Sequence, residues 1–322
     1  MKTLRFLATV IAGAFSVVLR RLFRGALRPT WTLRTELLRM SVRATLMGSV
    51  RFGVPWLRSL PSPARPDPHT RLDDVDAGGV PARWCVPTGA DADDRVVLYL
   101  HGGGYVFGSP RTHADIIARL AAQVPARVLA VEYRLGPEFP FPAAHDDCLA
   151  AYRWLVAQGT DPSRIVLAGD SAGGGLCTGT LLSLREAREP QPAGALLISP
   201  WVDPLADGGT IRSNEPFDVG TRDFLVNCIG LYLEGKPPDD ARVAPLGADL
   251  RGLAPLFIGV GRCEMLLDQA RALDARARDH GVKTQLSEYE DQFHVFQNLA
   301  AFIPEADRAV DEMVGWVRSR LG

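Results

Sequence analysis

Hydrophobic positions change their spacing along the chain and divide it into three regions. Residues 6–19, FLATVIAGAFSVVL, form an uncharged apolar run between basic residues. Over residues 29–60 apolar side chains recur at helical spacing among arginines, which predicts one or two amphipathic helices. Beyond residue 69, short apolar runs alternate with helical segments such as 112–124 and 143–158, which predicts an α/β fold with a mostly parallel sheet covered on both faces. Strands are expected at residues 82–86, 96–100, 127–133, 164–168, 194–199, 255–260 and 282–289.

The same regions predict the domain organisation. Residues 1–28 form an apolar and basic segment, and residues 29–68 supply cap helices followed by a stiff linker, PSPARPDP, at 61–68. The catalytic domain is expected to span residues 69–322. Within it, residues 200–251 interrupt the alternation of strands and helices, so we expect a second part of the cap there.

Three interpretations of the apolar run at residues 6–19 stay open. Fourteen residues are too few to cross a bilayer comfortably as a helix, so the run is not expected to span a membrane. An apolar helix with arginines at its ends can rest on a membrane surface or pack against the catalytic domain. A cleaved secretory signal is the rival, because Ala12-Gly13-Ala14 resembles a cleavage site.

Charge and cysteine usage restrict the function classes. The chain has 36 Lys and Arg against 37 Asp and Glu, so it has no overall attraction to nucleic acid. The first sixty residues, however, hold eleven basic residues and a single acid, Glu36. Five scattered cysteines without a C-x-x-C pair indicate neither a disulfide framework nor a zinc site. We therefore expect a cytoplasmic protein that contacts membranes, if at all, through residues 1–28.

A candidate nucleophile lies in the sequence GDSAG at residues 169–173. An apolar run precedes it, and small and apolar residues at helical spacing follow it. A strand that turns directly into a helix around G-x-S-x-G is a nucleophile elbow, which predicts Ser171 as the nucleophile. Without that context the motif would be explained by turn chemistry alone.

Three glycines in succession follow the strand predicted at 96–100, in HGGG at residues 101–104. Glycines at a strand end leave backbone N–H groups open to an oxyanion. A dinucleotide-binding loop is the competing interpretation, but the spacing G-x-G-x-x-G is not met. We expect Gly102 and Gly103 to form an oxyanion hole together with the N–H of Ala172.

The general base is sought among six histidines. His294 follows the last predicted strand, so it falls at the same carboxyl edge of the sheet as Ser171, where open α/β sheets bind ligands. This position predicts His294 as the base. Linker, loop or helix-end positions account for the others, which are His69, His101, His113, His145 and His280.

The acid of a Ser-His-acid triad should lie on the loop after the strand at 255–260. Glu264 and Asp268 are both candidates there. Glu264 is nearer the strand end, whereas Asp268 is explained by capping of the following helix, so Glu264 is preferred. The acid would hold the imidazole tautomer and stabilise the imidazolium.

With these residues in place, the chain resembles the hormone-sensitive-lipase-like carboxylesterases of the α/β-hydrolase fold, bacterial family IV. The resemblance implies Ser171 as nucleophile, His294 as base, and Gly102, Gly103 and Ala172 as oxyanion hole. It also implies a helical cap built from the N-terminus and from an insert. The family's usual acid is Asp in D-P-L-x-D, and here EMLLD places Glu264 at that position. The motifs that carry the resemblance are HGGG at 101–104, YRLGPEFPFPAA at 133–144, GDSAGG at 169–174, SPWVD at 199–203 and HVFQ at 294–297.

These features predict a serine carboxylester hydrolase acting on small, fairly apolar esters or lactones, without metal or organic cofactor. Amide N-deacetylation by the same triad is the enzymatic alternative. A catalytically silent binding protein is the other alternative, and His294 argues against it. The expected partner is a small-molecule ester, with no nucleic acid, and the protein is expected to be a monomer or a homodimer.

Overall fold

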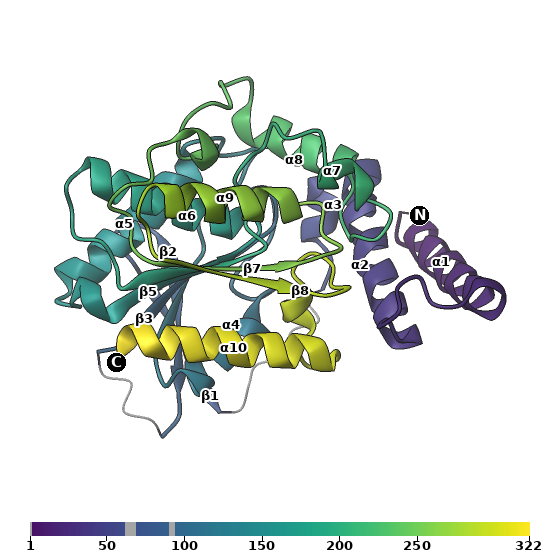
Figure 1. Ribbon diagram of the computed structural model, residues 1–322, viewed down its shortest axis with the longest axis horizontal. Helices are drawn as coiled ribbons and strands as arrows, with labels where there is room; N and C mark the ends of the chain where they lie inside the picture. Colours follow the sequence, from purple (N-terminus) through teal and green to yellow (C-terminus); the bar gives the residue numbers. More distant parts are fainter. Residues whose placement is uncertain (1, 62–68, 90–93) are drawn as a thin grey trace.

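The computed structural model describes residues 2–61, 69–89 and 94–322, so the linker predicted at 61–68 lies almost wholly outside the described residues. The predicted alternation of strands and helices is confirmed, as are the two groups of helices expected before and within it (Figure 1). The helices are α1 (Lys2–Arg24), α2 (Leu33–Phe52), α3 (Val54–Arg58), α4 (Ala114–Gln123), α5 (Ala143–Ala157), α6 (Ala172–Glu186), α7 (Thr210–Ser213), α8 (Arg222–Leu233), α9 (Leu267–Asp279) and α10 (Pro304–Leu321). The strands are β1 (Thr70–Asp76), β2 (Pro81–Pro87), β3 (Val96–Leu100), β4 (Arg127–Val131), β5 (Ile165–Asp170), β6 (Gly194–Ile198), β7 (Leu256–Gly261) and β8 (Thr284–Tyr289).

The eight strands form one sheet in the order β1-β2-β4-β3-β5-β6-β7-β8. The β1-β2 and β2-β4 pairs are antiparallel, and all other pairs are parallel. Parallel neighbours end at the same edge, so the ends of β5, β6, β7 and β8 lie in a row. The loops that carry the predicted nucleophile, acid and base therefore start from this one row.

Each parallel strand contributes to two separate cores because successive side chains point to opposite faces. On β3, Leu98 and Leu100 join the core under α5, α6 and α9, whereas Val97 and Tyr99 join the core under α4 and α10 (Figure 1). All five residues of β3 are buried. This near-continuous apolar run is what burial on both faces requires.

The cap is formed by α1, α2 and α3 together with α7 and α8. Arg39 and Arg43 of α2 bind the loop between α7 and α8 by donating hydrogen bonds to its backbone carbonyls. Arg39 is buried, and burial lowers its pKa to about 10. The two segments predicted to form the cap thus contact each other over the carboxyl edge of the sheet.

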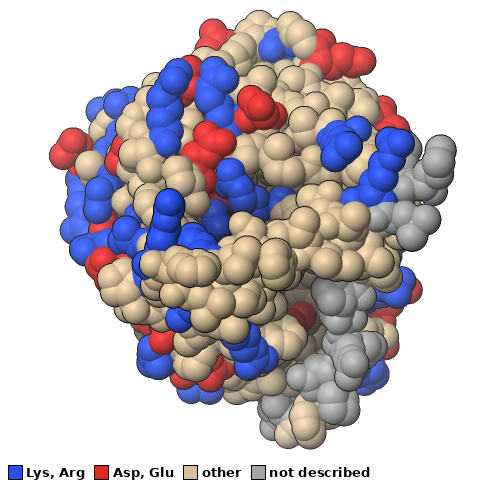
Figure 2. All heavy atoms as spheres, turned by 90° about the vertical axis from the view of Figure 1, so that its right-hand side faces the viewer, with Lys and Arg blue, Asp and Glu red and all other residues tan. Residues whose placement is uncertain are grey.

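Helix α1 is longer than the apolar run predicted for it, because the helix continues through the basic residues at both ends. Over Arg5–Arg24 it is long and apolar enough to span a membrane by length and composition alone, a test that signal sequences also pass. The prediction that this segment is too short to span therefore does not hold for the helix as folded. Helix α1 packs on α2 at the side of the molecule seen in Figure 2.

Candidate active site

Ser171 lies between β5 and α6 in a strained backbone conformation, with φ of 54° and ψ of −118°. Such a turn points the hydroxyl away from the sheet. Its tightness requires glycine on either side. A Cβ at Gly169 would lie 2.5 Å from the carbonyl oxygen of Gly173, and a Cβ at Gly173 would lie 1.9 Å from that of Leu100. The predicted elbow is therefore present.

His294 lies on the loop after β8 and joins two side chains. Its Nε2 is 2.9 Å from Ser171 Oγ, and its Nδ1 is 3.0 Å from Glu264 Oε2. These contacts fit a neutral imidazole that accepts the serine proton on Nε2 and donates its Nδ1–H to the carboxylate. Ser171, Glu264 and His294 thus form the chain of contacts that their positions in the sequence predicted.

Glu264 is fully buried three residues beyond β7. Its Oε1 accepts hydrogen bonds from the Ser199 hydroxyl at 2.7 Å and from the Gly261 N–H at 2.5 Å, which leaves Oε2 for the imidazole. Asp268, the other acid left open by the sequence, accepts a hydrogen bond from the Thr210 N–H at an exposed site. Of the two acids, Glu264 is the one that contacts His294.

The charge of Glu264 controls the proton affinity of the base. Burial by itself lowers the pKa of His294, but the hydrogen bond and negative charge of Glu264 outweigh it, and the pKa is raised overall. Asp218 and Asp170 add to the increase through their charges. The site therefore favours the imidazolium that forms after proton transfer.

The oxyanion hole differs from the prediction at one glycine. The N–H of Gly102 donates a 2.9 Å hydrogen bond to Asp170 Oδ1, so it is not directed toward a ligand. Within residues 2–61, 69–89 and 94–322 the N–H groups of Gly103, Gly104 and Ala172 have no hydrogen-bond acceptor. Gly103 and Gly104 also line the pocket beside Ser171. The assignment of Gly102 is therefore corrected to Gly104.

A profile described as the α/β-hydrolase fold matches residues 97–298 of the chain. The structure also superimposes on an esterase from the bacterial hormone-sensitive lipase family with a TM-score of 0.79 and 39% sequence identity, covering 99% of both chains. The chain belongs to the hormone-sensitive-lipase family of α/β-hydrolase esterases. A hormone-sensitive-lipase homologue from a metagenome library agrees, with a TM-score of 0.81 and 36% identity over 88% of this chain and 98% of that one.

Characterised relatives of this family member carry hydrolase names. An acetyl-hydrolase of Streptomyces hygroscopicus is 42% identical over 252 residues, which are 78% of this chain and 83% of the relative. An esterase of Acinetobacter venetianus is 32% identical over 234 residues, covering 70% and 75% of the two chains. The chain is thus an ester-hydrolysing enzyme by its relatives as well as by its fold.

Two buried aspartates that the sequence did not single out support the esterase site. Asp170 accepts hydrogen bonds from the Tyr99 hydroxyl at 2.7 Å, from the Gly102 N–H and from His113 Nε2 at 3.2 Å. It therefore fixes the first glycine of the oxyanion loop. His113, predicted only as a residue at a helix start, lines the catalytic pocket.

Asp218, on the loop between α7 and α8, accepts three backbone hydrogen bonds. The donors are the N–H groups of Val219 and Met265, each at 2.7 Å, and that of His294 at 2.9 Å. It thereby joins the loop that carries the acid to the loop that carries the base. An aspartate in an irregular insert forms no recognisable pattern, so only its position in the fold reveals this role.

The catalytic pocket has a volume of about 180 Å³ and is mostly apolar. Helix α2 contributes Val42 and Leu46, and α8 contributes Phe224. The rings of Phe107 and Phe224 are 6.1 Å apart in an edge-on arrangement. The remaining lining residues are Gly103, Gly104, His113, Asp170, Ser171, Val219, Phe293, His294, Val295, Asn298 and Leu299.

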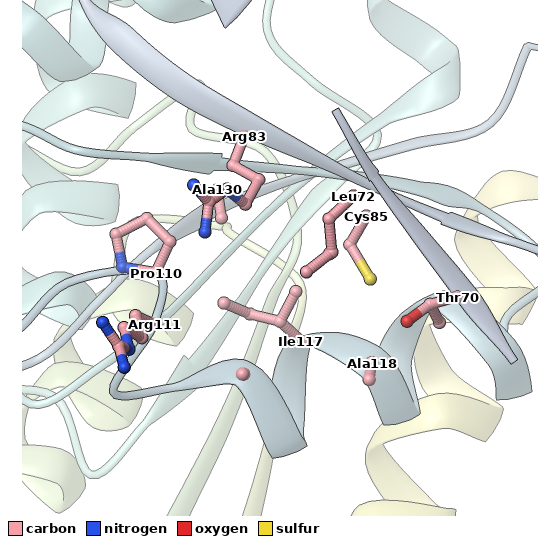
Figure 3. Close-up of a pocket in the computed structure, with 10 residues that line it drawn as sticks. Thr70, Leu72, Arg83, Cys85, Pro110, Arg111, Ile117, Ala118 and Ala130 are labelled. Atoms are coloured by element: carbon pink, nitrogen blue, oxygen red, sulfur yellow. The ribbon is translucent and has the colours of Figure 1, made fainter. Parts of the chain in front are cut away.

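A separate pocket of about 260 Å³ lies between the β1-β2 edge of the sheet and α4 (Figure 3). Leu72, Cys85 and Ile117 line it together with two arginines, Arg83 and Arg111. Arg83 is paired with Asp74. This pocket contains none of the three residues of the Ser-His-acid arrangement, so the chemistry belongs to the site at the carboxyl edge. All five cysteines are free and buried.

Proposed function

We propose that the protein is a serine carboxylester hydrolase that cleaves small, largely apolar esters through an acyl-enzyme. The observation that carries this proposal is the pair of contacts from His294, 2.9 Å to Ser171 Oγ and 3.0 Å to Glu264 Oε2. Nucleophile, base and acid are already within hydrogen-bonding distance before any substrate binds. A protein that only binds ligands has no need for this alignment.

The reaction begins when Ser171 Oγ attacks the ester carbonyl and its proton passes to His294 Nε2. The oxyanion that forms accepts hydrogen bonds from Gly103, Gly104 and Ala172, each of which contributes about 3–4 kcal/mol to the transition state. His294 then protonates the leaving alcohol. A water molecule, deprotonated by the same imidazole, hydrolyses the acyl-enzyme and releases the acid.

Pocket size supports a preference for short acyl chains. The volume of about 180 Å³ lies below the roughly 300–1,000 Å³ of pockets that hold drug-sized ligands. Phe107 and Phe224 occupy space that a longer chain would need. The apolar lining also favours uncharged acyl groups, because it offers no partner to a carboxylate.

The proposal is tested with Ser171→Ala and a series of p-nitrophenyl esters of increasing acyl length. The variant should lose p-nitrophenol release by a factor of at least about a thousand, since the oxyanion hole alone cannot supply the acyl-enzyme. Circular dichroism controls for folding. Unchanged turnover in a folded variant, or a preference for long acyl chains in the native protein, would contradict the proposal.

Amide deacetylation remains a second candidate because of Asn298. Its Oδ1 is buried in the catalytic pocket and has no hydrogen-bond partner among the described residues. An amide substrate has an N–H that this oxygen could accept, whereas an ester has none. Asn298→Ala should therefore slow hydrolysis of p-nitroacetanilide more than that of p-nitrophenyl acetate. Equal effects on both substrates would leave ester hydrolysis as the only supported activity.

We further propose a cytoplasmic location. Five buried cysteines without a disulfide are typical of a reducing compartment. Cell fractionation combined with N-terminal sequencing checks this, since a secreted protein would lack its first residues.

A further inference from the structure

Helix α1 is fixed to α2 through one of its faces. The Phe6 and Trp56 rings pack edge-on with centroids 5.0 Å apart. Arg20 and Arg21 both pair with Glu36 of α2, whose side chain is only 2% exposed. A helix held by aromatic packing and by two ion pairs to a buried acid has a defined orientation on the cap.

The opposite face of α1 is apolar and uncovered. At 100° per residue its large side chains occupy an arc of about 160° around the helix. Phe15 is 64% exposed and Phe23 is 83% exposed. A continuous exposed apolar surface of this kind marks a site of interaction. We call it the outer face of α1, and it consists of Leu7, Ile11, Phe15, Val18, Leu19, Leu22 and Phe23.

Charge indicates what covers this face. Helix α1 contains no acidic residue, and Arg5 and Arg24 are exposed near its two ends. Figure 2 shows Lys and Arg side chains in blue on both sides of an apolar band on this side of the molecule. Positive charge flanking an apolar stripe complements an anionic lipid surface, in which headgroups surround the acyl chains.

We propose that the outer face of α1 docks the protein on an anionic membrane, with the helix lying in the plane of the surface. The apolar side chains would insert among the lipids while Arg5 and Arg24 contact phosphate groups. The helix keeps its contacts with α2 in this arrangement. A membrane-spanning α1 would instead remove both arginine partners from Glu36, at a large cost for a buried acid.

The arrangement places the catalytic pocket one helix away from the lipid. Val42 and Leu46 of α2 line the pocket. An apolar groove of about 240 Å³ between α1 and α2, lined by Phe6, Ala44 and Met47, opens beside the same helices. Apolar substrates dissolved in the membrane would thus be concentrated near the pocket. Docking itself does not depend on the proposed chemistry.

The test measures sedimentation of the full chain with vesicles of phosphatidylglycerol and phosphatidylcholine in equal parts, and with vesicles of phosphatidylcholine alone. The triple variant Ile11→Ser/Phe15→Ser/Leu22→Ser should bind at least about tenfold more weakly, because three large side chains no longer enter the lipid. The double variant Arg5→Gln/Arg24→Gln should lose several-fold affinity for the anionic vesicles only.

A matched control is Val226→Ser/Phe139→Ser/Leu205→Ser, which removes the same kinds of exposed side chain away from α1. It should bind vesicles like the native protein. Hydrolysis of a water-soluble p-nitrophenyl ester reports whether each variant is folded. Equal binding by the outer-face variant and this control would overturn the proposal.

Two other occupants give distinct results. If a second copy of the chain covers the outer face, light scattering will show a dimer that the outer-face variant loses, and vesicle binding will be absent. If the segment is a removed signal, the intact mass of the protein from its host will lack α1. Either result overturns membrane docking.

Discussion

Glu264 reaches His294 with one carboxylate oxygen while Ser199 and Gly261 hold the other. The longer side chain is thus fixed at both oxygens, which offsets the freedom of its extra methylene. Ser199 also accepts a hydrogen bond from the N–H of Val295, the residue after the base. One hydroxyl therefore positions both the acid and the loop of the base.

Glu264→Gln should reduce kcat by about a hundredfold or more on a p-nitrophenyl ester. An amide in place of the carboxylate removes the charge that stabilises the imidazolium and favours the wrong tautomer. Asp268→Asn is the matched control and should keep nearly full activity, because Asp268 binds Thr210 at the surface. The reverse order of effects would place the acid at Asp268.

Asp218→Asn should move the acidic limb of the kcat/KM profile to lower pH. His294 is the base only when neutral, so activity falls as the pH drops through its raised pKa. Glu264, Asp218 and Asp170 raise that pKa with their negative charges. Removing the charge of Asp218 weakens the imidazolium, lowers the pKa and extends activity to lower pH.

Asp223→Asn, at an exposed position of α8, is the control for this shift. It should leave the profile in place. A role of Asp218 in packing alone would reduce kcat without moving the inflection, and that result would refute the electrostatic argument.

Sequence was informative at residue scale where chemistry dictates a local pattern. Ser171 and His294 follow from a strained turn and from a strand end. The donor Gly104 could not be distinguished from Gly102, because only the neighbouring Asp170 shows which N–H is already bonded. Asp218 acts on residues 47 and 76 positions away, a separation at which no spacing rule operates.

Among the elements, α8 sets the size of the pocket. Phe224→Ala should shift the preferred acyl length upward by a few carbons, since the ring that meets Phe107 is removed. The relative kcat/KM across a p-nitrophenyl ester series measures the shift. Val226→Ala, an exposed position on the same helix, should leave the preference unchanged. An unchanged optimum in Phe224→Ala would mean that another residue limits chain length.

Seven of the eight strands were predictable because they are short apolar runs between helices. Strand β1 was not, since its sequence TRLDDVD is charged and mostly exposed at the sheet edge. Its pairing with β2 gives it strand structure, and pairing is a property of the fold. The ends of α1 were missed for a related reason, because arginine continues a helix as well as most apolar residues do.

For the whole molecule, the N-terminal segment is attached to the catalytic loop through Asp291. Arg28 and Thr30 donate hydrogen bonds to its carboxylate, and the Trp31 indole donates to its carbonyl. Asp291 lies three residues before His294. Residues 25–32 therefore connect the cap to the loop that carries the base.

Two truncations separate this connection from the packing of α1. Deleting residues 1–24 should preserve kcat, because the contacts to Asp291 remain. Deleting residues 1–31 should lower kcat at least about tenfold and also lower Tm, since a buried carboxylate loses its partners. Steady-state kinetics and thermal denaturation measure both effects. Equal kcat for the two truncations would show that the loop of the base is rigid without the clamp.

Helix α2 has three neighbours at once. Met40 meets α1, Val42 and Leu46 form pocket wall, and Arg39 and Arg43 hold the loop of Asp218. A substitution that suits one of these neighbours disturbs another, so α2 has little freedom to diversify. Efforts to redirect substrate choice by randomised libraries should accordingly leave α2 untouched and concentrate their diversity on α8.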